Sequence, residues 1–303
     1  MKKLLLILTI LLLFCPESYA QSENIALLTK KGFFEKTSSF SLNSCEEVRK
    51  IVLAHNKYAN EYNFEGLKSL YSDTYMNSDG LGKSVYFDLI KKTWESYPDI
   101  KYKLEITDIE VSGDTAAVQV KEEAVANTSS KSGIVNEKGL LESSSASVYY
   151  LEKIYDKWFI TSDSIIFEKT SLRYGSAKNL DIELSAPGQI SANTDYTVAL
   201  KLENPKDSIV IASIGRENIT YPQKIADEVF RKLPEEGILE RMFKSNNKNI
   251  NEYAVASFGI TKAEIKNSSE IKIYVTGLGF VMSRVNVIPE NKYVKVDKDE
   301  KSE

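Results

Sequence analysis

The chain contains a single histidine, His55, which is the first candidate for acid–base chemistry. Imidazole is the side chain whose ordinary pKa lies closest to neutral pH, so His55 could donate a hydrogen bond or transfer a proton. It recurs with apolar residues at helical spacing within residues 48–62, which places it on the buried face of an expected helix. A core histidine with a satisfied nitrogen is the alternative interpretation.

Aromatic residues are the second group of candidates for a functional role, and the chain has 17 tyrosines. At helical and strand spacings such rings fill a core, and contact with a ligand is the alternative. A buried phenol needs a hydrogen-bond partner, so the tyrosines indicate a partly polar interior. Asp163 follows the predicted strand around Trp158 and is either a surface residue or an acid of that interior.

Composition and charge exclude several functions. Lys+Arg number 39 against 43 Asp+Glu, a formal net charge of −4, so no basic excess exists to bind nucleic acid. One histidine and two cysteines are too few for a multi-ligand zinc site. The sequence has no glycine-rich phosphate loop and no His-Glu-x-x-His motif. We therefore expect no metal and no cofactor.

The N-terminus has the pattern of a secretory signal peptide. Two lysines precede an apolar run at residues 4–14, and small residues stand at Ser18 and Ala20. Cleavage after Ala20 would export the chain to the periplasm or the extracellular space. A lipoprotein anchored through Cys15 is the alternative, although Phe14 stands where a lipobox has a small residue. No later stretch is apolar enough to span a membrane.

Apolar periodicity predicts three helices and then long strands. The helices are expected over 44–62, 64–71 and 83–96, the first beginning at a capping box on Ser44 and the second capped by Asn63.

Alternating apolar and polar residues then predict a hairpin that turns at Gly113. A polar loop at 127–139 and a second pair of strands that reaches Glu168 follow. Helices followed by an antiparallel meander are typical of an α+β fold.

The rest of the chain changes character after a short linker. Short alternating runs separated by Gly, Pro and Asn turns predict a β-sandwich with the rhythm of immunoglobulin-like domains, interrupted by a short helix at 225–233. The expected division is a signal peptide at 1–20, a lead-in at 21–43, an α+β domain at 44–169, a linker at 170–178, a β-sandwich at 179–296 and a charged tail at 297–303.

Two segments carry a resemblance to a known family. Residues 62–71, Tyr-Asn-Phe-Glu-Gly-Leu-Lys-Ser-Leu-Tyr, look like the entry to the second helix of the nuclear transport factor 2-like superfamily. Residues 158–160, Trp-Phe-Ile, look like its closing hairpin. Together with the element order, residues 44–168 resemble this superfamily, including its SnoaL-like and ketosteroid-isomerase-like branches.

The resemblance implies a cone of three helices on a curved antiparallel sheet, with an apolar pocket inside the cone. In the enzymes of the family a carboxylate acts as general base, and a tyrosine with a second acid stabilises an enolate. Asp79 matches the region of that base, although Gly80 follows it where the family has proline, and His55 aligns near the enolate-binding tyrosine. The alternative for Asp79 is a simple turn residue. The residues expected to line the pocket are Tyr58, Tyr62, Tyr75, Trp94, Tyr102 and Tyr150.

The function expected from the sequence is that of an exported, non-catalytic ligand-binding or protein-interaction protein, since this fold also serves many proteins without catalysis. Its partner would be a small apolar or amphipathic ligand or another envelope protein, with a homodimer as an open alternative. An isomerase or dehydratase that uses Asp79 and His55, and a structural envelope component, are the other two hypotheses.

Overall fold

The computed structural model describes residues 34–224, 226–267 and 270–290, and this part of the chain is mostly antiparallel sheet with few helices. The predicted signal peptide and charged tail lie outside the described residues, as does the lead-in up to residue 33. None of the described helices combines the length and the apolar character that crossing a membrane requires.

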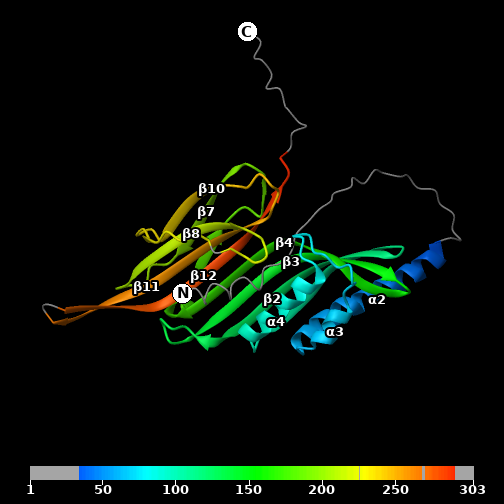
Figure 1. The fold of residues 1–303 in the computed structure, drawn as a ribbon, viewed down its shortest axis with the longest axis horizontal. Coiled ribbons are helices and arrows are strands. Elements are labelled where there is room, and N and C mark those ends of the chain that lie inside the picture. Colours follow the sequence, from blue (N-terminus) through cyan, green and yellow to red (C-terminus); the bar gives the residue numbers. More distant parts are fainter. Residues whose placement is uncertain (1–33, 225, 268–269, 291–303) are drawn as a thin grey trace, which may run out of the picture.

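Three helices cover one face of the first strands (Figure 1). They are α2 (Phe34–Asn60), α3 (Phe64–Ser69) and α4 (Lys83–Ser96). The expected helix start at Ser44 is wrong, because α2 begins at Phe34 and Ser44 lies buried within it. Its capping-box partner Glu47 instead accepts a hydrogen bond from Trp158 Nε1 at 3.1 Å. The predicted cap of α3 is confirmed, since the Asn63 side chain accepts from a backbone N–H at 2.9 Å.

Helix α2 packs on the sheet through one stripe of side chains. Val48, Val52, His55 and Ala59 follow one another at intervals of three and four residues, and each is less than 9% exposed. This spacing fixes the direction of His55, which faces the strands and not the solvent.

Four long strands follow the helices. They are β1 (Lys101–Ser112), β2 (Thr115–Lys131), β3 (Lys138–Ile154) and β4 (Lys157–Gly175). The predicted hairpin between β1 and β2 is confirmed, and Gly113 adopts a φ of 60° in its turn. Strands β2 and β3 extend into the expected loop at 127–139, where only residues 132–137 lie outside both strands.

Strand β4 runs through both halves of the structure. Its last residues, 169–175, pair antiparallel with residues 277–283 of β12 (Glu270–Ile288). The linker expected at 170–178 is therefore the end of β4 followed by a short 3-10 helix, η1 (Ser176–Asn179). Pairing with a distant strand satisfies this backbone, and a local sequence pattern cannot indicate such a partner.

The remaining strands complete two sheets. They are β5 (Ile182–Ser185), β6 (Gln189–Ser191), β7 (Asp195–Leu202), β8 (Ile209–Asn218), β9 (Arg231–Lys232), β10 (Ile238–Lys244) and β11 (Glu252–Asn267). One sheet has the order β1-β2-β3-β4-β12-β11-β8-β9, with β6 parallel to β12. The other has the order β10-β7-β5, and apolar side chains of the two sheets share one core. The short helix expected at 225–233 is wrong, because the described residues there contain only β9 and irregular backbone.

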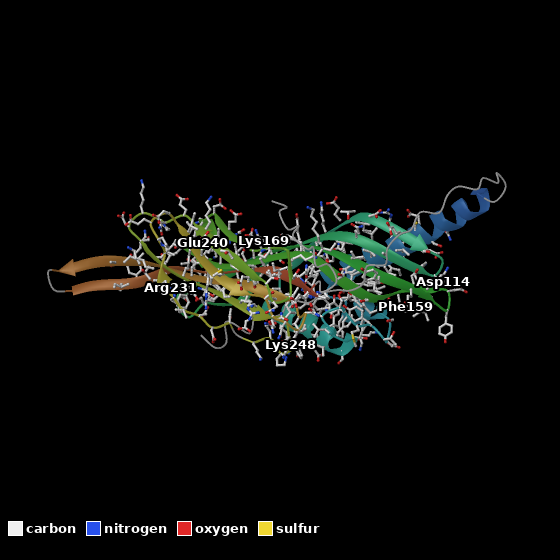
Figure 2. The ribbon with its side chains drawn as sticks, turned by 90° about the horizontal axis from the view of Figure 1, so that it is seen from above. Asp114, Phe159, Lys169, Arg231, Glu240 and Lys248 are labelled. Carbon is white, nitrogen blue, oxygen red and sulfur yellow. The ribbon has the colours of Figure 1, made fainter. Side chains whose placement is uncertain are left out.

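The molecule is elongated along its strands (Figure 2). Asp114, in the turn between β1 and β2, lies toward one end, and Arg231 of β9 lies toward the other. Lys169, at which β4 begins to pair with β12, lies between them.

Buried apolar side chains form a large core in each half, a cluster at the junction, and a small cluster of Ile219, Tyr253 and Met282. In this junction cluster, Tyr97 and Ile100 after α4 pack with Leu172 and Tyr174 of β4, and Phe280 of β12 packs against them. A continuous sheet and packed side chains thus join the two halves.

A substitution at Gly175 tests the packing at this junction. Gly175 has a φ of 55°, and a Cβ at this position would overlap the carbonyl oxygen of Thr276 and the side chain of Val135. We expect Gly175→Ala to lower the free energy of unfolding by more than about 1 kcal/mol, measured by chemical denaturation. Gly133→Ala is the matched control, because a Cβ added at Gly133 would have no other atom within 4 Å. Equal effects of the two substitutions would contradict the described junction.

Candidate functional site

A partly open cavity of about 130 Å³ lies between α2, α4 and strands β1 to β4. Its wall is mostly apolar and aromatic, and the described residues that form it include no lysine or arginine. The titratable and aromatic side chains on the wall include His55, Tyr86, Trp94, Tyr102, Glu122, Tyr149 and Glu168. Such a concave, mainly apolar site with a few polar groups is the usual form of a small-molecule site.

Glu122 is a carboxylate on an otherwise apolar strand face. Alternation along β2 puts it on the same face as Val118 and Val120, which are both buried. The Tyr149 hydroxyl donates to Glu122 Oε1 at 2.9 Å. Burial raises the pKa of Glu122 to about 7, while the Tyr149 hydrogen bond acts in the opposite direction. Near neutral pH this carboxyl can therefore either accept or release a proton.

His55 is an uncharged histidine in the cavity wall. It is 8% exposed, and its ring centroid lies 5.9 Å from that of Tyr71 and 5.5 Å from that of Tyr149. Burial lowers its pKa to about 4, so the imidazole is neutral at physiological pH. Its Nδ1 atom has no hydrogen-bond partner within the described structure. His55 is therefore a neutral polar group of the cavity wall and not a charged general acid.

Two further acids lie on β4, Asp163 and Glu168, with exposures of 0% and 2%. Tyr75 donates to Asp163 Oδ2 at 2.7 Å, and Tyr253 donates to Glu168 Oε2 at 3.4 Å. Burial raises the pKa of Asp163 well above its ordinary value and the pKa of Glu168 to about 8. The Glu168 carboxyl is thus mainly protonated at neutral pH and can donate a hydrogen bond into the cavity.

Asp79, the base that the family resemblance implies, is held in a buried ion pair. Arg284 Nη2 donates to its Oδ1 at 2.9 Å and to its Oδ2 at 3.1 Å, and the two side chains are 3% and 0% exposed. Asn251 Nδ2 also donates to Oδ1, at 3.0 Å. Asp79 is not among the residues that form the cavity wall. Its carboxylate connects the turn between α3 and α4 to β12.

Asparagines extend this network around Arg284. Asn286 Oδ1 accepts from Arg284 Nε at 2.7 Å, and Asn286 Nδ2 donates to the Ile166 carbonyl of β4 at 2.9 Å. Asn251 Oδ1 accepts from the backbone N–H of Val287 at 2.8 Å. The network therefore fixes β4, β11 and β12 relative to the turn that carries Asp79.

The structure places only some of the aromatic residues predicted for the pocket in the cavity wall. Trp94 and Tyr102 lie in the cavity wall. Tyr58 is partly buried against the helix core, and Tyr75 is buried with its hydroxyl on Asp163.

Tyr62 donates to the carbonyls of Pro98 and Ile100 at 3.0 and 2.9 Å and lies outside the cavity wall. Tyr150 is 43% exposed on the opposite face of β3, because alternation directs its neighbour Tyr149 inward. Tyr149 therefore occupies the place in the cavity wall that the sequence predicts for Tyr150.

Sequence reasoning missed Glu122, Tyr149 and Glu168. The sequence contains a signal for Glu122, since alternation along β2 puts it on the same face as the buried valines of that strand. Glu168 has no such signal, because the pairing of β3 with β4 shifts twice. Each shift adds one residue to β4. The side chains that face inward therefore change between even-numbered and odd-numbered positions at each shift.

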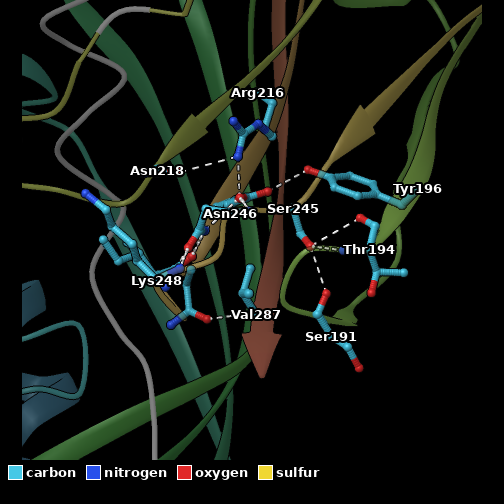
Figure 3. A network of polar contacts seen from close by, with 12 residues as sticks. Ser191, Thr194, Tyr196, Arg216, Asn218, Ser245, Asn246, Lys248 and Val287 are labelled. Carbon is cyan, nitrogen blue, oxygen red and sulfur yellow. Dashed lines mark hydrogen bonds and ion pairs between the residues drawn. The ribbon is translucent and has the colours of Figure 1, made fainter. Parts of the chain in front are cut away.

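A buried carboxylate in the other half, Glu252, contrasts with Glu122. Figure 3 shows Tyr196, Arg216 and Asn246, which surround it. Glu252 is 0% exposed and accepts from Tyr196 at 2.8 Å and from Asn246 N and Nδ2, both at 2.7 Å. Arg216 forms an ion pair with it. Both oxygens of Glu252 are engaged by the protein, so this acid is structural. Glu122 has no ion pair with any described residue and lies on a cavity.

No group of three or more His, Cys, Asp or Glu residues within the described ranges is arranged to hold a metal ion. The cavity acids therefore have to be understood through their own protonation.

No protein-family model matches the chain, and no curated protein matches its sequence. Similar solved structures include hexachlorocyclohexane dehydrochlorinase LinA-type3 from Novosphingobium barchaimii LL02, with 16% identity and a TM-score of 0.34 over 41% of this chain and 86% of that chain. A nuclear transport factor 2 (NTF2-like) superfamily protein from Salmonella enterica matches with 13% identity and a TM-score of 0.32, over 43% of this chain and 91% of that chain. The likeness covers less than half of this chain, and what these proteins bind or catalyse is not carried over to it.

The ion pair of Asp79 predicts a structural effect of its removal. Asp79→Asn leaves the buried guanidinium of Arg284 without its countercharge, and we expect a loss of about 3 to 5 kcal/mol in the free energy of unfolding. Asp88→Asn, at an exposed position of α4, is the control and should leave stability almost unchanged. Chemical denaturation measures both, and an Asp79 variant as stable as wild type would refute the structural role.

The raised pKa values of Glu122 and Glu168 predict lower stability at higher pH. Both carboxyls titrate near 4.5 in the unfolded chain, so the folded state binds their protons more tightly. Their stabilising effect is complete below about pH 4.5. It is lost as pH rises through about 7 for Glu122 and through about 8 for Glu168. Burial also raises the pKa of Asp163, which therefore acts in the same direction. His55 affects stability in the opposite direction, because burial lowers its pKa. Its contribution to the free energy of unfolding is constant above its unfolded pKa of 6.5.

Melting temperature should therefore fall as pH rises above 6.5. Glu168→Gln should reduce this slope, whereas Glu105→Gln on the exposed face of β1 should keep it. Identical slopes for wild type and Glu168→Gln would show that Glu168 is not protonated in the folded state.

Proposed function

We propose that residues 44–169 form a nuclear transport factor 2-like domain that binds a small amphipathic ligand in its cavity. The observation that carries this proposal is the cavity itself, which has aromatic walls and the carboxyl of Glu122 with a pKa of about 7. Helices α2, α3 and α4 on strands β1 to β4 follow the element order of that family. Burial of an apolar ligand surface would supply affinity, and the polar groups would set orientation.

The size of the cavity limits the ligand. An engineered protein cavity of about 150 Å³ binds benzene, so about 130 Å³ limits the ligand to a single ring with at most a short substituent. His55 Nδ1 and Glu122 offer polar contacts to that substituent.

The rest of the chain is proposed as a β-sandwich of immunoglobulin-like type. Support comes from β10-β7-β5 packing over β8, β11 and β12 through one apolar core. The N-terminal pattern supports export to the periplasm or beyond, where the sandwich would contact another envelope protein or a second copy of the chain.

Proton transfer is the second candidate function, as in an isomerase or dehydratase. Glu122 has the pKa expected of a general base at neutral pH. It would take a proton from a carbon next to a carbonyl and return it to another carbon of the same molecule. The protonated carboxyl of Glu168 or the Tyr86 hydroxyl would stabilise the enolate oxygen, and no cofactor is required.

Thermal shift with a library of single-ring compounds tests the binding function. We expect some compounds to raise the melting temperature of the full chain and of Glu105→Gln. Ala59→Leu should abolish the shift, because Ala59 lies in the cavity wall and a larger side chain there occupies ligand volume. Absence of any shift would favour the structural envelope hypothesis.

The same compounds separate binding from catalysis. For carbonyl compounds that bind, deuterium uptake from D₂O can be followed by NMR. Uptake with wild type but not with Glu122→Gln would establish proton transfer, and binding without uptake would establish a binding protein.

A further inference from the structure

We propose that the ligand of this cavity is a single-ring amine, whose ammonium group binds between the Glu122 carboxylate and His55 Nδ1. The inference rests on the proposed function, because it names the chemical class of ligand for the same cavity. Its evidence is the charge, the acceptor atoms and the ring faces of the cavity wall.

The charges of the wall select for a cation. Glu122, Glu123 and Glu168 line the cavity, and the described lining residues include no lysine or arginine. The buried guanidinium of Arg284 forms an ion pair with Asp79 outside the wall, and Glu123 pairs with Lys103 at 3.0 Å. Glu122 forms no ion pair with a described residue, so a bound cation would supply the charge that its carboxylate lacks, whereas an anion would be repelled by it.

A buried polar atom without a partner gives independent evidence for a hydrogen bond between the wall and the ligand. His55 is more than nine-tenths buried, lines the cavity, and its Nδ1 has no hydrogen-bond partner. With its proton on Nε2, the neutral imidazole accepts a hydrogen bond at Nδ1. A buried acceptor left unpaired costs about 1 to 3 kcal/mol, a cost that an N–H donor on the ligand removes.

Tyr149 lies next to both Glu122 and His55. Its hydroxyl donates to Glu122 at 2.9 Å, and its ring centroid lies 5.5 Å from that of His55. One side chain thus contacts both the carboxylate and the imidazole. An ammonium group has three N–H donors and no acceptor, which suits a site with two acceptors.

Aromatic rings complete the site. Trp94, Tyr86 and Tyr102 lie in the same wall. The faces of such rings carry partial negative charge and attract ammonium groups, most strongly where water is excluded. The ring of the ligand would pack against the apolar residues of the wall, such as Leu89 and Ile90.

Ligand binding should be coupled to the protonation of Glu122. The titratable groups that influence this carboxyl are Tyr86 of α4, Tyr102 of β1, Tyr149 of β3, and Asp163 and Glu168 of β4, together with His55 of α2 in the same wall. His55 is neutral and the other groups are neutral or acidic, so none of them supplies a positive charge near pH 7. A bound ammonium would supply one, favour the ionised carboxyl, and release a proton.

Three probes of similar shape test the proposal: benzylamine, benzyl alcohol and benzoate, titrated into the full chain by calorimetry. We expect benzylamine to bind at least about ten-fold more tightly than benzyl alcohol at pH 7.5, and benzoate to bind more weakly than both. Binding of benzylamine should release protons, and its affinity should fall about ten-fold or more between pH 7.5 and pH 5.5 as Glu122 becomes protonated.

The matched variants are Glu122→Gln and Glu105→Gln. Glu122→Gln retains an oxygen for the Tyr149 hydrogen bond, so the fold should persist, and it should remove both the preference for benzylamine and its pH dependence. Glu105→Gln should keep both. Circular dichroism checks the fold of each variant, and the wild-type comparison of the three probes stands even if one variant does not fold.

The outcomes separate this inference from the proposed function. Equal or tighter binding of benzyl alcohol or benzoate, or a preference for benzylamine that survives in Glu122→Gln, overturns the amine ligand and leaves a binding cavity. If none of the probes binds, and the thermal-shift library also gives no shift, the proposed function falls together with the inference.

Discussion

A guanidinium buried inside a protein must be neutralised where it lies, and the ion pair of Arg284 with Asp79 does this at the junction of the two halves. Asn251 and Asn286 satisfy further hydrogen bonds of the same pair. Because Asp79 lies between α3 and α4 while Arg284 lies on β12, the pair holds the helical layer against a strand from the end of the chain. The position of the cavity depends on this arrangement, since α4 and β4 both contribute to its wall.

Three carboxylates illustrate how environment separates structural from functional acids. Asp79 faces a guanidinium, and Glu252 is surrounded by Arg216, Tyr196 and Asn246. Glu122 has a tyrosine hydroxyl and a cavity, and its charge has no protein partner among the described residues. A ligand can change the energy of such a group by much more than it can change the energy of a saturated one.

The secondary structure of the first half was largely readable from periodicity. Helix α4, the Asn63 cap and the hairpin at Gly113 follow from local patterns, because short-range hydrogen bonds and turn geometry determine them. The predicted start of the first helix was wrong, since a serine that can cap a helix can also lie inside a longer one. The linker at 170–178 failed because its backbone pairs with a strand far away in the chain.

The sequence by itself determined which residue types are available: one histidine, many tyrosines, and an acid on the apolar face of a strand at Glu122. Only the tertiary structure decided their roles. Asp79 became structural because Arg284, about two hundred residues later, folds against it. Tyr149 rather than Tyr150 faces the cavity because strand alternation fixes its direction, and Glu168 joins it because bulges in β4 change that direction along the strand. Such choices depend on contacts between distant segments, which a local sequence pattern does not contain.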